Sequence, residues 1–333
     1  MRILTGFFIL LCLSPVPALS SLHEVREVHY QMGTFLELTL WHSEDEAAKR
    51  LIREAVGEVH RLEEILSNFD PESDISRFNR LAGKGKTNLH PDLYELLKIA
   101  LQFSAKTTGY FDVTVGPLVE SWKASLLTGR LPSQEALAKT RRLVGYEKLK
   151  LYDGGAAELL MRDMKIDLGG IGKGYAVDRV VAQLKEQRVV SALINFGGSS
   201  IYALGAPPGK RGWEIGIQGT HGELLGVILL SDMALSTSGS MGRFWIVGGK
   251  KYGHLIDPKK GMPITESRMA TVITPSATAA EALTKPLVIL GKNALPMAKE
   301  LPQTEAVIIP KQGPLFFSNG FRSKSMWREP PAT

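Results

Sequence analysis

The sequence predicts an α+β protein, because helical and strand patterns occupy different parts of the chain. Three segments of the first half place apolar residues at helical spacing, whereas the second half consists mainly of short β-rich runs broken by Gly, Pro and Asn. No internal repeat and no change of composition marks a linker among the 333 residues. We therefore expect a single domain, which could have two lobes.

In the first half, the elements follow from periodicity and helix end signals. Pro91 at the first turn and Gly109 past the last turn mark the two ends of a helix over 91–106. Ser133 is typical of the N-cap of a further helix. The expected elements are a strand over 27–40 around Met32, a long amphipathic helix over 44–66, a loop over 67–79 with a helical turn after Ser73, and helices over 91–106 and 133–143.

In the second half, β-forming runs between turn residues predict the strands. Strands are expected over 148–152, 159–167, 189–196, 212–218, 224–230, 244–247, 269–274, 305–310 and 314–317, with helices over 172–188 and 276–290.

The N-terminus has the pattern of a secretory signal peptide. Met1-Arg2 precedes an apolar run over 3–13, and Ala18 and Ser20 supply small residues before a cut at Ser21. We expect residues 1–20 to be the signal, 21–325 the domain and 326–333 a tail, in a periplasmic or otherwise exported protein. Cys12 follows Leu11 rather than a small residue, so a lipid anchor is not expected. The run over 3–13 is too short to span a membrane, and no other stretch is long and apolar enough to do so.

The charge pattern gives little sign of a nucleic-acid partner. The net charge is +6, but the basic residues are spread along the chain and form no basic-aromatic strip. Such a surface would attract an anion such as a pyrophosphate, or an acidic partner.

The segment from Asp167 to Ala176 has the strongest phosphate-binding pattern. A strand that ends at Leu168 leads into Gly169, Gly170, Gly172 and Gly174, and a helix then begins. Glycines let backbone N–H groups approach a ligand, and a helix N-terminus favours phosphate. Lys173 adds a point charge suited to a pyrophosphate. The alternative is a tight strand-to-helix turn that binds nothing.

His254-Leu255-Ile256-Asp257-Pro258 predicts a short strand that ends in a turn. His254 could act as a general base or hold a phosphate oxygen, and Asp257 could orient a group or take a proton. A lone histidine is more often structural.

Two further segments combine turn residues with groups that could meet a ligand. Tyr110, Phe111 and Asp112 lie in a predicted constrained loop over 109–118, where the rings could stack on a flavin or an adenine. The alternative is a hydrophobic anchor with a capping aspartate. Asn195-Phe196-Gly197-Gly198 predicts either a second loop that approaches a ligand closely or a simple β-turn. The hydroxyl run over 236–240 could donate hydrogen bonds to an anion, but on its own it favours an ordinary polar turn.

Taken in order, these segments resemble the ApbE family, the FAD:protein FMN transferases. The resemblance runs from Met32 to the helix over 279–291. The matching motifs are Met32-Gly33-Thr34, Leu66-Ser67-Asn68-Phe69, Ser73-Asp74-Ile75-Ser76-Arg77-Phe78-Asn79, Phe111 to Leu118 with Trp122, Asp167 to Ala176, Asn195 to Gly198, Thr237-Ser238-Gly239 and His254 to Pro258.

The resemblance implies a T-fold-like architecture, with mixed or antiparallel sheets flanked by helices, and FAD as both ligand and FMN donor. FMN would be attached to a threonine of an acceptor flavoprotein of an electron-transfer system through a phosphoester bond, with release of AMP and with Mg²⁺ as the cation. It implies an FAD pocket formed by Met32, Phe69, Tyr110, Phe111, Asp112, Asp167, Lys173 and His254, with His254 and Asp257 as catalytic residues and Gly170, Glu281 and Thr284 as the metal site.

One segment departs from the family pattern. The family's metal segment usually reads Ala-Asp-Ala-Leu-x-Thr, whereas this chain has Ala280-Glu281-Ala282-Leu283-Thr284-Lys285. Residues three and four apart share a helix face, so both Thr284 and Lys285 could lie near Glu281. Glu281 and Thr284 could hold a metal in a shifted geometry, the Lys285 ammonium could replace the metal, or the site could bind flavin without transferring it.

Two other functions therefore stay open at this point. One is an FAD-binding carrier or sensor without transfer activity. The other is a metal-dependent FAD pyrophosphatase, in which water replaces the threonine hydroxyl.

Overall fold

One antiparallel sheet of eight strands organises the chain, of which the computed structural model describes residues 22–240 and 244–330. The strand order is β1-β2-β6-β7-β10-β15-β16-β17, and every pair in it is antiparallel. Its strands are β1 (His23–Gln31), β2 (Thr34–His42), β6 (Ser191–Phe196), β7 (Ser200–Gly205), β10 (Met233–Gly239), β15 (Arg268–Thr274), β16 (Glu305–Pro310) and β17 (Phe316–Phe317).

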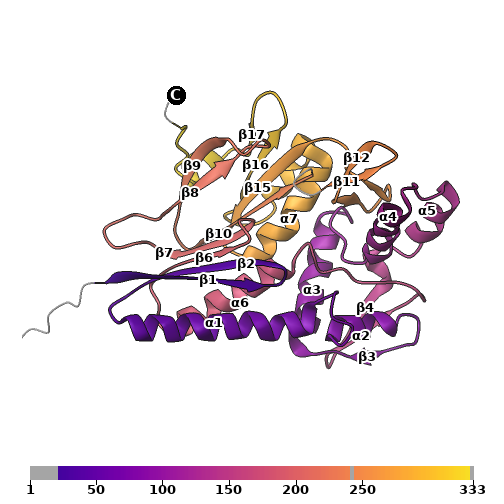
Figure 1. Cartoon of the computed structure of the whole chain (residues 1–333), viewed down its shortest axis with the longest axis horizontal. Coiled ribbons are helices and arrows are strands. Elements are labelled where there is room, and N and C mark those ends of the chain that lie inside the picture. Colours follow the sequence, from indigo (N-terminus) through magenta and orange to yellow (C-terminus); the bar gives the residue numbers. More distant parts are fainter. Residues whose placement is uncertain (1–21, 241–243, 331–333) are drawn as a thin grey trace, which may run out of the picture.

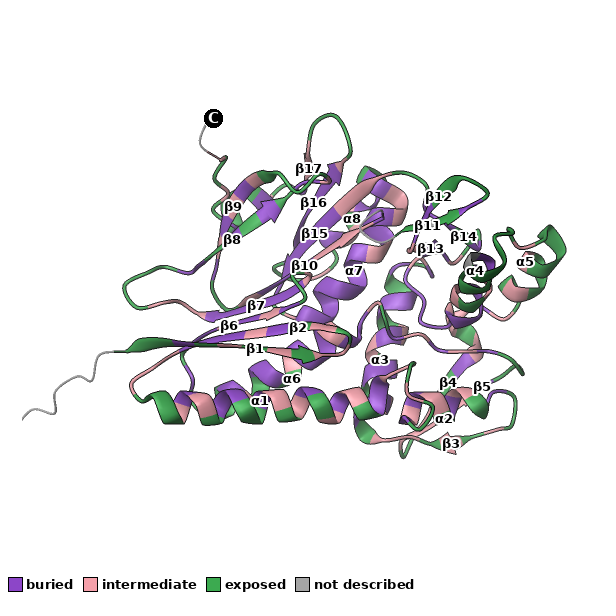
Figure 2. Cartoon of the chain, in the orientation of Figure 1, coloured by how far each residue is buried: buried purple, intermediate pink, exposed green. Residues whose placement is uncertain are grey.

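Helices cover one face of this sheet (Figure 1). They are α1 (Asp45–Leu66), α6 (Gly172–Glu186) and α7 (Ala277–Leu290). The main core forms between them and alternate strand residues such as Leu38, Ile194 and Val272, because successive side chains of a strand point to opposite faces. Figure 2 shows that α7 is buried along most of its length. The predicted α+β class with antiparallel sheet and flanking helices is confirmed.

A second layer covers the opposite face of the sheet. The hairpin of β8 (Trp213–Gln218) and β9 (Leu224–Leu230) packs there with the short helix α9 (Phe321–Lys324). Their apolar side chains form a separate cluster with the outward-facing residues Ile201, Leu235 and Val307 of the large sheet.

The short helix α8 (Leu295–Ala298) contacts β16. The other helices and strands gather beside the helical layer (Figure 1). A third apolar cluster, centred on Trp122 of α4 and Tyr252 of β12, holds part of this region together. The elements are α2 (Asp74–Arg80), β3 (Thr87–Asn88), α3 (Pro91–Lys106), α4 (Gly116–Thr128), α5 (Gln134–Arg141), β4 (Leu149–Tyr152), β5 (Ala156–Leu159), β11 (Phe244–Val247), β12 (Lys250–Gly253), β13 (Ile256–Asp257) and β14 (Met262–Pro263).

Four predictions of local structure were wrong. The expected strand over 27–40 is a hairpin, since Met32 and Gly33 both have positive φ and reverse the chain. The expected strand over 159–167 reduces to the end of β5 and an isolated bridge at Lys165. Residues 116–128, partly read as loop, form α4. The hydroxyl run at 236–239, for which a turn was the favoured reading, lies in β10 within the sheet.

The chain termini bear on the predicted boundaries. The predicted signal peptide, with Cys12 and the cut before Ser21, lies outside the described residues, as do residues 331–333 of the predicted tail. Contacts with the domain continue past residue 325, because Arg328 pairs with Val227 and the Trp327 ring packs near those of Phe317 and Phe321. Within residues 22–240 and 244–330, no helix is both long enough and apolar enough for a membrane crossing.

Candidate functional site

The site is built where the first turns of α6 cross α7. An ideal Cβ on Gly174 would lie 2.4 Å from the carbonyl oxygen of Ala277, so only glycine allows this approach. Asp178, one turn further along α6, accepts hydrogen bonds from the backbone N–H groups of Ala277 and Thr278 at 2.7 and 2.9 Å. This carboxylate caps the N-terminus of α7 and fixes the register of the two helices.

Glu281 is the buried acid at the centre of the crossing. Its side chain is 2% exposed, and Oε1 accepts from Lys173 Nζ at 2.9 Å while Oε2 accepts from the backbone N–H of Gly174 at 2.6 Å. Both carboxylate oxygens therefore face the first turn of α6. In this structure Lys173 and the Gly174 N–H, which belong to the segment predicted to bind phosphate, have the Glu281 carboxylate as their partner.

Lys285, one helical turn after Glu281, brings a second ammonium to the same place. Its Nζ lies 3.9 Å from Glu281 Oε1, and it donates to Ser238 Oγ at 3.2 Å and to Thr284 Oγ1 at 3.3 Å. The stem crosses Gly170, since an ideal Cβ on that glycine would lie 3.3 Å from Lys285 Cε. The structure thus brings Gly170, Glu281 and Thr284 together, with the Lys285 ammonium among them.

The charges of this cluster shift the pKa values of its members. Burial opposes ionisation of Glu281, but the charges of Lys173 and Lys285 outweigh it and hold the pKa of Glu281 below its ordinary value. Burial lowers the pKa of Lys285 to about 8, against the opposing effect of Glu281. The cluster holds two basic groups and one acid, so an anion would be stabilised there.

The side chains around Gly170, Glu281 and Thr284 are not arranged to coordinate a divalent cation. Mg²⁺ needs near-octahedral oxygen ligands. Glu281 offers the only carboxylate of this set, and its Oε1 already pairs with the Lys173 ammonium at 2.9 Å while its Oε2 accepts from the Gly174 N–H. Near a protein surface, a divalent cation about 4 Å from the Lys285 ammonium would be repelled by about 8 kcal/mol. Among the described residues, no group of three or more His, Cys, Asp or Glu side chains could hold a metal.

Two further predicted residues adjoin the cluster. The ring of Phe111 is buried, with one carbon 3.6 Å from an ideal Cβ on Gly170, so it supports the glycine turn from beneath. Asp167 accepts from the backbone N–H of Gly169 at 2.8 Å, and its own N–H donates to the carbonyl oxygen of Val113 at 2.7 Å. The 111–115 and 165–170 segments therefore lie side by side.

Asp112 connects this pair of segments to an open cleft of about 470 Å³ that it helps to line. One carboxylate oxygen accepts from the Thr114 N–H at 2.8 Å and hydroxyl at 2.7 Å, and the other accepts from the Tyr146 N–H at 2.9 Å. Burial raises the pKa of Asp112 to about 6, against these bonds. Asp112 thus stabilises the wall of the cleft through hydrogen bonds. This role resembles the capping aspartate that was the alternative prediction for this loop.

The opposite wall of the cleft comes from the turn after β13. Pro258 and Lys259 line it together with Arg141 and Arg142. Lys259 Nζ lies 4.4 Å from the centre of the Tyr110 ring, and Arg141 donates to the carbonyl oxygen of Lys259 at 2.5 Å. The cleft therefore joins the Tyr110–Asp112 loop to the end of the histidine motif. Its charged lining consists of Arg141, Arg142 and Lys259 together with Asp112 and Glu147.

The predicted catalytic pair, His254 and Asp257, directly precedes the Pro258–Lys259 turn that lines the cleft. His254 is half-buried in the bend between β12 and β13, directly after Gly253, whose ideal Cβ would lie 2.1 Å from the carbonyl oxygen of Ser240. This contact brings the histidine segment to the end of β10, two residues from Ser238. Asp257 is 2% exposed and accepts from the N–H groups of Lys259 and Lys260 at 2.9 and 3.2 Å, which fixes the turn.

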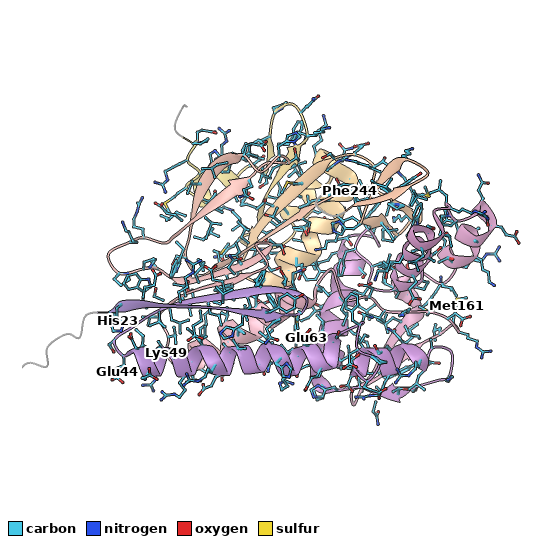
Figure 3. The ribbon with its side chains drawn as sticks, viewed as in Figure 1. His23, Glu44, Lys49, Glu63, Met161 and Phe244 are labelled. Atoms are coloured by element: carbon cyan, nitrogen blue, oxygen red, sulfur yellow. The ribbon has the colours of Figure 1, made fainter. Side chains whose placement is uncertain are left out.

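Met32 and Phe69 lie near the C-terminal end of α1. The N–H of Met32 donates to Glu63 Oε2 at 2.9 Å, and Glu63 is labelled below the end of the β1–β2 hairpin in Figure 3. Phe69, three residues after α1, is 87% exposed and lies 5.2 Å from Lys123 Nζ. An exposed aromatic ring beside a cation is available to stack on a planar ligand.

Sequence reasoning missed several residues that build the site. Ser238 was assigned to a polar run, yet its hydroxyl lies 2.8 Å from Thr284 Oγ1. Asn68 and Asn79 both donate to the carbonyl oxygen of Ile166, at 2.7 and 3.0 Å, and so hold the segment before the glycine turn. Both asparagines lie in motifs that resemble the family, and this was the available signal in the sequence. The motifs did not indicate which backbone group the asparagines would contact.

Comparison with known proteins gives a consistent result. The model of the ApbE family matches residues 32–308. An FAD:protein FMN transferase of Escherichia coli (strain K12) is 28% identical over 93% of this chain and 91% of its own, and one of Treponema pallidum is 30% identical over 74% and 73%. The solved flavinyl transferase ApbE of Pseudomonas stutzeri, in its apo form, has a TM-score of 0.81 at 27% identity and covers 92% of this chain and 98% of its own.

The family match extends over most of the chain, and it includes both walls of the cleft and the cluster around Glu281. The order of the motifs, their convergence in space and the similarity of the whole fold agree with one another. This chain belongs to the ApbE family.

Proposed function

We propose that this chain transfers the FMN half of FAD to a threonine of an acceptor protein. The observation that carries the proposal is the family match over residues 32–308, which includes every segment of the site. Relatives that cover most of the chain are named FAD:protein FMN transferases. The glycine turn lies beside the Tyr110–Asp112 loop, and that loop meets the end of the histidine motif at the cleft, which supports the proposal.

The proposed reaction is a phosphoryl transfer. The threonine hydroxyl attacks the phosphorus on the FMN side of the pyrophosphate, a new P–O bond forms, and the bond to the bridging oxygen breaks so that AMP leaves. The hydroxyl proton goes to a base. Such a reaction depends on in-line positioning and on neutralising the negative charge of the phosphates.

His254 is the proposed proton acceptor. It follows Gly253, which abuts the end of β10 near Ser238, and its motif ends in the turn that lines the cleft. Asp257 supports it by fixing that turn through its hydrogen bonds to Lys259 and Lys260. Lys173 provides positive charge at the first turn of α6, where the positive end of the helix dipole would also favour a phosphate.

The proposed acceptor is a flavoprotein of an electron-transfer system outside the cytoplasm. The signal pattern of residues 1–20 supports an exported enzyme that works in the periplasm or beyond. The net charge of +6 would favour an acidic surface around the acceptor threonine.

Magnesium is the cation that the family resemblance implies for this reaction. When bound, Mg²⁺ would neutralise phosphate charge. The residues predicted to hold it carry an inserted ammonium instead, so the roles above are assigned to side chains of the chain itself and none depends on a bound metal.

The direct test is to incubate residues 21–333 with FAD, Mg²⁺ and flavin-accepting domains of exported electron-transfer proteins. We expect an FMN adduct by mass spectrometry and one AMP per adduct by chromatography. The same domains with the acceptor threonine replaced by valine should gain no mass. His254→Ala should slow transfer by about 100-fold or more while FAD binding persists.

The other outcomes identify the two alternative functions. AMP and free FMN without an adduct would show hydrolysis of FAD and contradict the transferase. Tight FAD binding with neither product, across the whole set of acceptor domains, would favour a carrier or sensor.

A further inference from the structure

We infer that the Lys285 ammonium takes the place of a divalent cation at the pyrophosphate of FAD, so that this chain binds its donor without a metal at Glu281. The inference rests on the proposed function, because it assumes that FAD is the ligand. It concerns the residues of α7 that depart from the family pattern.

The position of the ammonium is the first observation. Lys285 Nζ is 3.3 Å from Thr284 Oγ1 and 3.9 Å from Glu281 Oε1, and its stem crosses Gly170. These are the three residues predicted to hold the metal. A positive group is thus surrounded by the predicted metal ligands, and it belongs to the chain itself.

The excess of positive charge is the second observation. Lys173 already pairs with Glu281 at 2.9 Å, so Lys285 is a second ammonium beside a carboxylate that has a partner. The side chain of Lys285 is only 14% exposed, so water screens this excess weakly. One lysine would be enough to neutralise Glu281 in an ordinary helical ion pair, but two ammonium groups lie beside this carboxylate. A bound anion would balance the second positive charge.

The hydrogen bonds of Lys285 leave it able to reach a ligand. An ammonium has three donors, and two of them point to the hydroxyls of Ser238 and Thr284. At 3.9 Å, Glu281 Oε1 is an ion-pair partner beyond hydrogen-bond distance. Among the partners that the described residues provide, the third donor therefore has no acceptor, and a phosphate oxygen would supply one.

The glycine turn makes room for this lysine. Gly170 has no Cβ, which would otherwise lie 3.3 Å from Lys285 Cε and 3.9 Å from Cγ. The same turn precedes α6, and the positive end of that helix's dipole would favour a phosphate there. Lys285 and Lys173 would then contact the pyrophosphate from α7 and α6.

The test measures FAD binding and metal binding separately, with Lys285→Thr as the main variant. Threonine restores the residue that the family usually has at this position. FAD affinity is measured by quenching of flavin fluorescence in EDTA and in excess Mg²⁺, and metal binding by the electron paramagnetic resonance of Mn²⁺. Lys98→Thr is the matched control, because Lys98 lies exposed on α3 and outside the site.

For the wild type we expect FAD affinities within twofold in EDTA and in Mg²⁺, and no Mn²⁺ bound with FAD. Lys285→Thr should lose roughly tenfold or more in FAD affinity in EDTA, recover it in Mg²⁺, and bind Mn²⁺ when FAD is present. Lys98→Thr should behave as the wild type.

A second variant keeps the inference testable if the threonine variant does not fold. Lys285→Met retains the apolar stem over Gly170 without the charge, and it should weaken FAD binding whether or not Mg²⁺ is present. Folding of each variant is checked by circular dichroism. A methionine variant that binds FAD as tightly as the wild type would overturn the inference.

The outcomes separate this inference from the proposed function. If the wild type binds FAD tightly only with Mg²⁺ and takes up Mn²⁺, Lys285 does not replace the metal and the inference fails. The proposed FMN transfer would still stand in that case. If the wild type binds no FAD in either condition, both the inference and the proposed function fail.

Discussion

Asp112 is a buried carboxylate in the lining of the cleft, and its hydrogen bonds hold a turn together. It accepts hydrogen bonds from Thr114 and from the N–H of Tyr146, 34 residues further along the chain. Burial nevertheless raises its pKa to about 6, so desolvation outweighs these bonds. At neutral pH the wall of the cleft therefore carries a charge that the folded state accommodates at a cost.

Asp112→Asn should change the pH dependence of stability. The pKa of about 6 in the folded state exceeds the value near 3.9 of an unfolded aspartate, so between these values the folded state binds more protons. The free energy of unfolding of the wild type should therefore fall as pH rises through this window, by about 3 kcal/mol relative to the asparagine variant. Urea unfolding from pH 4 to pH 7 measures it, and parallel curves would contradict the raised pKa.

At the scale of elements, the crossing of α6 and α7 determines the site. Gly174 permits the close approach, Asp178 caps α7, and Glu281 joins the helices through Lys173 and the Gly174 N–H. Every charged group of the cluster lies on one of these two helices. A small change in their separation would therefore change the positions of both ammonium groups together.

Gly174→Ala should destabilise the protein and weaken FAD binding. The new methyl group would lie 2.4 Å from the Ala277 carbonyl oxygen and force the helices apart, at a cost of about 1–3 kcal/mol in the free energy of unfolding. The matched control is Gly57→Ala in α1, where no atom lies within 4 Å of an ideal Cβ and the change should stabilise by about 0.5–1 kcal/mol. Urea unfolding and FAD titration test both variants, and equal effects at the two glycines would contradict the role of the crossing.

At the scale of the whole molecule, one face of the large sheet contributes to the site and the other face packs against structural elements. The face toward α6 and α7 carries the site, and Ser238 of β10 meets Thr284 there. The opposite face packs against the β8–β9 hairpin and the C-terminal segment, in a cluster that includes Trp327. Trp327 also lies over Gly226, which leaves no room for a side chain.

Trp327→Ala should therefore reduce stability without changing the site. Loss of the ring contacts with Phe317 and Phe321 should lower the free energy of unfolding by about 1–3 kcal/mol, because the ring is only partly buried. FAD affinity should stay within twofold of the wild type, as measured by flavin fluorescence at a temperature where the variant is folded. A large loss of FAD affinity would show that the two faces are coupled.

Local signals in the sequence were sufficient for the helices that carry the site and for the order of the motifs. Apolar spacing and caps predicted α1, α3, α5, α6 and α7 to within a few residues, because these signals depend on neighbours three or four positions away. The same local rule placed Glu281, Thr284 and Lys285 on one side of a helix. The departure at Lys285 was visible in the sequence alone.

Only the tertiary structure decided which partners these residues meet. An ordinary polar turn was the favoured prediction for the hydroxyl run of β10, yet the run is a strand of the sheet. The Thr237 hydroxyl meets that of Thr271 on β15, and the Ser238 hydroxyl meets that of Thr284 on α7. The Lys285 ammonium lies beside Glu281 because β10, the Gly170 turn and the Gly174 crossing converge there from positions far apart in the sequence. Helix periodicity fixes the direction of a side chain, but the distance to a distant segment depends on how the whole chain packs.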